Sequence, residues 1–227
     1  MEEKKNIKVG NKTRKKTNKK VKLNNKFKIL ILVIIITLII CGIILFTFLH
    51  GKDDEKPTTT ITITNTIDNY GYSLTNNATD YYKELFEKLK KTLDNENVND
   101  ELYASLVSQL FITDFYTLNN KIGNSDVGGL EFFLESSRDN FALKAKNTIY
   151  KSVKSNLYGD REQNLPEVTK VSVDSITKTS YSYNGITDSE AYNVKTSVTY
   201  DVDLGYPTEV RLTLVHNGSK IEIAKVN

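Results

Sequence analysis

Cysteine occurs only once in the 227 residues, at Cys41 inside a long apolar run, and tryptophan is absent. A single cysteine excludes an intrachain disulfide, so a folded domain in this chain has to be stabilised by its hydrophobic core. The roughly 160 residues that follow the apolar run are numerous enough to bury such a core. We therefore expect one domain without covalent cross-links.

Histidine is also scarce, with His50 beside the apolar run and His216 far from it in the sequence. This excludes the usual zinc sites, which combine several histidine and cysteine ligands. The chain also lacks the spacing of an EF-hand, a serine nucleophile elbow, a glycine-rich phosphate loop and a Cys-x-x-Cys pair. We expect no metal and no cofactor, and these absences favour a non-enzymatic function without excluding an enzyme.

The overall charge of +3 is the average of two oppositely charged parts. Residues 1–28 hold 12 Lys/Arg against two Glu, a net charge of +10, whereas residues 50–227 hold 19 Lys/Arg against 26 Asp/Glu, a net charge of −7. The basic segment has too few apolar residues to fold, so 1–28 is predicted to be a disordered tail that contacts anionic membrane lipids. A nucleic-acid patch or a site for a cytosolic partner is the less favoured alternative, and no nucleic acid is expected.

Residues 29–49 form an apolar run of 21 residues without any charged side chain. As a helix this run is about 30 Å long, which matches the hydrocarbon core of a bilayer. Because lysines gather before it, we expect a cytoplasmic N-terminus and a C-terminal domain outside the cell membrane, in a single-pass protein with an uncleaved signal anchor. A cleaved signal peptide is disfavoured by the length of the run, and a lipoprotein by Ile40 before Cys41.

The region after the membrane segment divides into a predicted linker, 50–78, and a predicted domain, 79–227. The linker is polar and rich in threonine, although the alternation of Ile61 and Ile63 also suits a short strand. From residue 79 apolar residues recur every four positions, which predicts helices over about 79–93, 102–118 and 139–157.

After Pro166 the apolar period changes from about four residues to two, which is typical of strands. Strands are expected over 168–183 and around 192–202, and two further strands are expected on either side of Asn217-Gly218. Asn184-Gly185 and Asn217-Gly218 are typical of tight hairpin turns. The predicted fold class is therefore α+β, with N-terminal helices packed on a C-terminal antiparallel meander of about four strands.

This order of elements resembles the NTF2-like, or cystatin-like, superfamily, in which N-terminal helices pack into the concave face of a curved antiparallel sheet. The resemblance covers about residues 79–227 and rests on element order rather than on a motif. A short basic N-terminus, one membrane helix and such an outer domain also resemble the inner-membrane assembly factors of type IV secretion and conjugation systems. That resemblance implies a scaffold that forms homo-oligomers and contacts other envelope proteins.

Four polar residues are candidates for chemistry in a cleft between helix and sheet. Asp114 lies on the apolar face of the second helix, and His216, Tyr192 and Tyr200 have the inward parity of their strands. A carboxylate base beside a phenol donor is suited to proton abstraction. The alternative is structural: Asp114 lies near a helix end, where it can be hydrogen-bonded, and His216 lies beside a turn.

Two functional hypotheses follow from the sequence. The favoured one is a membrane-anchored extracytoplasmic interaction or scaffold domain of a bacterial cell envelope, in a narrower form an assembly factor of a secretion or conjugation system. The alternative is a domain that binds a small ligand, or an NTF2-like enzyme, using the helix–sheet cleft. A deep pocket that contains Asp114 and His216 favours the second hypothesis, and a filled core favours the first.

Overall fold

The computed structural model describes residues 24–50 and 58–227, which belong to two separate compact units divided near residue 55. The first unit contributes one helix, α1 (Asn25–His50). The most apolar stretch of its segment Asn25–Phe46 reaches a mean hydropathy of 3.6, and the 22 residues of this segment are long and apolar enough to cross a membrane. This agrees with a single-pass anchor; the orientation stays a prediction.

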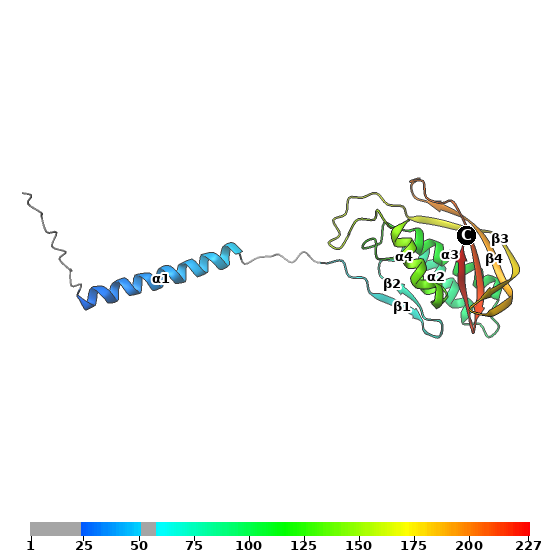
Figure 1. The fold of residues 1–227 in the computed structure, drawn as a ribbon, viewed down its shortest axis with the longest axis horizontal. Helices are drawn as coiled ribbons and strands as arrows, with labels where there is room; N and C mark the ends of the chain where they lie inside the picture. Colours follow the sequence, from blue (N-terminus) through cyan, green and yellow to red (C-terminus); the bar gives the residue numbers. More distant parts are fainter. Residues whose placement is uncertain (1–23, 51–57) are drawn as a thin grey trace, which may run out of the picture. The chain divides into compact units, whose positions relative to one another are not determined.

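The second unit begins with a hairpin where the sequence analysis predicts a linker. Strands β1 (Ile63–Ile67) and β2 (Tyr72–Thr75) pair antiparallel around a 3₁₀ turn, η1 (Asp68–Tyr70), and Gly71 follows that turn with a φ of 66° (Figure 1). The linker prediction is therefore wrong over residues 63–75. This segment folds as part of the domain because its residues Ile67, Tyr72 and Leu74 are buried in the hydrophobic core.

Two helices then follow as the spacing of apolar residues predicts, α2 (Asp80–Leu93) and α3 (Asp100–Tyr116). Thr79 and Asn99 cap their N-termini, since each side-chain oxygen accepts a hydrogen bond from a backbone N–H in the first turn. The two helices pack on each other, and α3 also packs against the sheet. The face of α2 that carries Leu85 and Leu89 is buried.

The third predicted helix is only partly correct. Helix α4 (Glu135–Asn147) follows a short 3₁₀ turn, η2 (Leu130–Phe132), and ends at Thr148, whose φ of −123° and ψ of −93° are not helical. Residues 148–157 form turns and irregular structure instead of the predicted helix. The reason is Tyr150: its hydroxyl donates to the Phe115 carbonyl at 2.6 Å inside the core, which draws the chain away from the helical path.

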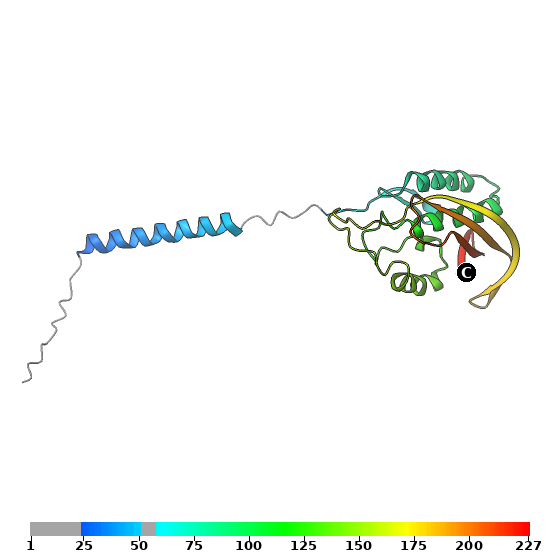
Figure 2. The ribbon, with the colours of Figure 1, turned by 90° about the horizontal axis from the view of Figure 1, so that it is seen from above.

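The sheet is the predicted four-stranded antiparallel meander. Strands β3 (Val168–Tyr183), β4 (Ile186–Tyr200), β5 (Glu209–Asn217) and β6 (Lys220–Val226) neighbour one another in chain order. Asn184 and Gly185 form the β3–β4 turn with φ values of 49° and 77°. Figure 2 shows how strongly the long β3–β4 pair bends. The α+β class is confirmed; the specific NTF2-like arrangement stays a prediction.

Both edges of the sheet are partly covered by the helical layer. At β6, Phe133 forms a parallel bridge with Ile223, and the Leu134 N–H donates to the Ile223 carbonyl at 3.1 Å. At β3, the Val171 N–H donates to the Tyr81 hydroxyl at 2.9 Å. These contacts satisfy backbone groups that an open edge would leave available for pairing.

Candidate functional site

Asp114, the predicted carboxylate base, lies in the last turn of α3, and each of its carboxylate oxygens has a partner. Its Oδ1 forms an ion pair with the ammonium group of Lys121, a residue only 4% exposed. Its Oδ2 accepts a hydrogen bond from the Gly129 N–H at 2.6 Å. These partners support the structural reading of Asp114, because both of its oxygens hold the 121–129 loop against α3.

The glycine pair 128–129 makes this close approach to α3 feasible. A Cβ on Gly128 would lie 2.4 Å from the Asp114 carbonyl oxygen, a distance that no side chain tolerates. Gly129 has a φ of 75°, in the left-handed region that favours glycine. The two glycines therefore place η2, and with it Glu131, beside Asp114.

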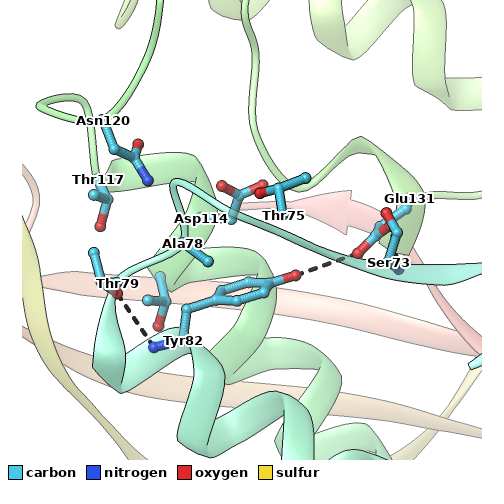
Figure 3. A pocket seen from close by; sticks show the side chains of 10 residues that line it. Ser73, Thr75, Ala78, Thr79, Tyr82, Asp114, Thr117, Asn120 and Glu131 are labelled. Carbon is cyan, nitrogen blue, oxygen red and sulfur yellow. Dashed lines mark hydrogen bonds between the residues drawn. The ribbon is translucent and has the colours of Figure 1, made fainter. Parts of the chain in front are cut away.

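Glu131 is the site residue that sequence reasoning missed. Its Oε2 accepts hydrogen bonds from the Ser73 N–H at 3.1 Å and the Ser73 hydroxyl at 3.0 Å. Its Oε1 accepts one from the Tyr82 hydroxyl at 3.2 Å, which is drawn as a dashed line in Figure 3. Burial raises the pKa of Glu131 to about 7; the hydrogen bonds from Ser73 oppose this rise, and the nearby Asp114 charge adds to it. Glu131 thus joins the N-terminal hairpin to the rest of the domain through a carboxyl with a raised pKa.

The two carboxyl groups line one small polar pocket between β2, α2 and α3. Hydroxyl and amide groups form the rest of its wall, from Ser73, Thr75, Thr79, Tyr82, Thr113, Thr117 and Asn120, together with the methyl group of Ala78. Its volume is about 90 Å³, which is room for a few water molecules. Pockets for organic ligands are typically about 300–1,000 Å³. The pocket can therefore hold a proton and water, but it is too small for an organic substrate.

The predicted partner His216 lies elsewhere, at the end of β5. Its Nδ1 is 3.0 Å from Asp188 Oδ2 and its Nε2 is 3.7 Å from Asp100 Oδ2. Burial works to raise the pKa of Asp188, but hydrogen bonds from the backbone of His216 and Glu190 and from the imidazole lower it overall. This cluster joins three elements, β4, β5 and the start of α3.

The two candidate tyrosines do not join Asp114 either. The ring of Tyr192 lies 5.8 Å from the His216 ring, and the Tyr200 hydroxyl donates to the Pro207 carbonyl at 2.8 Å. Neither tyrosine nor His216 is among the described residues that line the Asp114 pocket. The structure thus places Tyr192 with His216 and keeps Asp114 and Tyr200 apart from them, and it does not assemble the four residues in one cleft.

A larger depression lies on the outer face of the sheet, defined as the face that bears Asn193, Lys195, Arg211, Thr213 and Lys225. This groove has a volume of about 660 Å³, and all four strands contribute to it. Hydroxyl and amide groups alternate there with the three cationic side chains, and Tyr181 lies at one side. Its size suits a side chain or short segment of a partner.

One acidic residue lies beside the groove and orders two of its cations. Glu209 is 2.9 Å from the Lys195 ammonium and 2.8 Å from the Arg211 guanidinium. The hydrogen bonds from Lys195 and then Arg211 lower the pKa of Glu209. Lys225 has no carboxylate within ion-pair distance among the described residues. The three cations and one anion leave the groove with a net positive charge.

No cluster of three or more metal-ligating side chains occurs in the part of the chain that the structure describes. Comparison with known protein families, with curated proteins and with solved structures finds no match to this chain.

Proposed function

We propose that this chain is a membrane-anchored interaction protein of a bacterial cell envelope, and that the groove on the outer face of its sheet binds another envelope protein. The observation that carries the proposal is the cationic groove itself. It presents Lys195, Arg211 and Lys225 on a domain whose residues 50–227 have a net charge of −7. A local charge opposite to the domain average favours and orients a partner segment that bears carboxylates.

The packing on the helix side of the domain also favours an interaction protein over an enzyme. A packed core lies between α3 and the sheet, and in the pocket of about 90 Å³ Glu131 already accepts hydrogen bonds from Ser73 and Tyr82. Asp114 and Glu131 accept hydrogen bonds from the backbone N–H groups of Gly129 and Ser73, so both carboxyl groups have structural partners.

In its narrower form the proposal names an assembly factor of a secretion or conjugation system. The apolar helix α1 supplies an anchor, and the excess of lysine before it favours a domain outside the membrane. A scaffold of this kind would hold the groove near the membrane surface, and homo-oligomers would present several grooves at once, which strengthens weak contacts.

A second candidate function is proton transfer at the Glu131 pocket. The observation that favours it is a carboxyl with a pKa of about 7 beside Tyr82 and Asp114, a combination suited to general acid–base chemistry. The volume of the pocket weighs against this candidate. Asp114→Asn in a stably folded protein separates the two: loss of function would favour the pocket over the groove.

The test is partner recovery with charge-reversed variants. Lys195→Glu and Arg211→Glu should each reduce the co-purified envelope partner at least tenfold after mild cross-linking, at matched protein levels. Lys170→Glu is the matched control, because Lys170 is an exposed lysine on β3 outside the groove. A higher salt concentration should also reduce the amount of partner recovered with the wild type, because salt screens the charges of the groove. Equal recovery by all three variants would contradict the proposal.

A further inference from the structure

A second cavity of about 300 Å³ lies between α4 and β6, away from the Glu131 pocket. Its wall is apolar, with Phe115, Phe133, Phe141, Ile149 and Val226 as the main contributors. The Phe133 and Phe141 rings stack at 4.1 Å between centroids, and Phe115 lies 5.1 Å from Phe141. The rings support one another, so they form a preorganised wall.

The cavity exists because α4 packs loosely on the sheet. Ala145 is the one buried residue of this helix, whereas Phe141 on the same face is only partly buried. The chain before α4 covers the edge of β6 at Ile223, but the strand continues to Val226. The space between the end of β6 and the helix is the apolar cavity.

Two lysines belong to the lining of this cavity. Lys144 of α4 and Lys225 of β6 are both exposed and both belong to the lining. Among the described residues neither ammonium has a carboxylate within ion-pair distance. Two unpaired cations over an apolar cavity complement a ligand with an apolar body and one anionic end.

We propose that this cavity binds a free amphiphilic anion, a single alkyl chain that ends in a carboxylate, with the chain against the three phenylalanines and the carboxylate between Lys144 and Lys225. The volume corresponds to roughly ten water molecules, and it lies at the lower end of ligand pockets. It suits one medium-length chain and not a two-chain lipid. The inference does not depend on the outer-face groove, although Lys225 also lines that groove.

The test is equilibrium dialysis of labelled decanoate with the full chain in phosphatidylcholine nanodiscs, against empty nanodiscs at the same lipid concentration. We expect the protein-containing nanodiscs to bind more decanoate than the empty nanodiscs, and this excess to saturate at one decanoate per chain. Lys144→Glu should weaken this excess at least tenfold, because it replaces attraction of the carboxylate by repulsion. Lys146→Glu is the matched control: it makes the same charge change on the same helix, at an exposed lysine outside the cavity.

Two further arms separate the cavity from other sources of binding. Ser137→Phe fills the cavity from the first turn of α4 and should abolish the excess, while decanol should bind at least tenfold more weakly than decanoate. The proposal is overturned by no saturable excess, by equal binding in Lys144→Glu and wild type, or by equal weakening in Lys146→Glu. In a last arm, the nanodiscs contain phosphatidylglycerol. If the cavity face attaches to these nanodiscs and decanoate does not displace it from them, the face docks on membranes, and the proposal is overturned.

Discussion

Glu131→Gln should remove a pH dependence of stability that this one carboxyl produces. Its pKa is about 7 in the folded domain, against 4.5 for the same group without the surrounding protein. The folded state therefore prefers the protonated form, so the domain loses stability as the pH rises from about 4.5 through 7. At ~1.4 kcal/mol per pH unit, this difference amounts to about 3 kcal/mol at pH 8.

The glutamine variant keeps the shape of the side chain without its charge. Its carbonyl oxygen can accept the hydrogen bonds from the Ser73 N–H and hydroxyl, and its amide can donate to the Tyr82 oxygen. We expect the variant to match the wild type within ~1 kcal/mol at pH 4 and to exceed it by about 1–3 kcal/mol at pH 8.

The assay is urea unfolding of residues 58–227, followed by circular dichroism between pH 4 and 8. Glu135→Gln is the control, because Glu135 is exposed at the start of α4 and should leave the pH profile of the wild type unchanged. Parallel profiles for wild type and Glu131→Gln would refute the reasoning, since they would show that the carboxyl ionises equally easily in the folded and unfolded states.

Three more expectations are open to direct measurement. Protease added to spheroplasts should remove residues 58–227 and spare the basic tail; protection of the domain would reverse the proposed orientation. A soluble fragment 58–227 should unfold cooperatively, whereas a fragment 76–227 should lose several kcal/mol of stability, because it lacks the buried Ile67, Tyr72 and Leu74; equal urea midpoints would contradict this. Asp114→Asn should lower the free energy of unfolding by about 1–3 kcal/mol, because the buried Lys121 loses its anion, and an unchanged urea midpoint would count against that role.

The elements that the sequence predicts well are those whose signal is local. Leu85 and Leu89 recur at helical spacing, and both are buried on α2. Asn184-Gly185 has the positive φ values that a tight hairpin turn demands, and it lies where β3 turns into β4. In each case the residues that decide the conformation are neighbours in the chain, so their pattern is readable without tertiary information.

The Glu131 pocket was not predictable for the opposite reason. Ser73, the main partner of Glu131, lies 58 residues earlier in a segment whose threonine-rich composition is typical of a linker. Glu131 itself is the one charged residue in a short apolar stretch, and a charge in such a place is a weak sign of a buried polar contact. The sequence does contain the Gly128-Gly129 pair, which indicates that the backbone approaches another segment closely there. The pair does not indicate which segment that is.

The groove on the outer face depends on strand register, and register explains why its cations come together. Ser175 pairs with Lys195, and Lys195 pairs with Arg211, so one row across three strands places two cations side by side. The next row pairs Asn193 with Thr213, and Thr213 with Lys225.

A slip of one residue in β5 would turn Arg211 toward the core and expose Leu212, which is 1% exposed in the observed register. The burial of Val210, Leu212 and Leu214 on the inner face thus fixes which cations appear on the outer face. Substitutions that weaken core packing of β5 should therefore disturb partner binding even where they touch no groove residue.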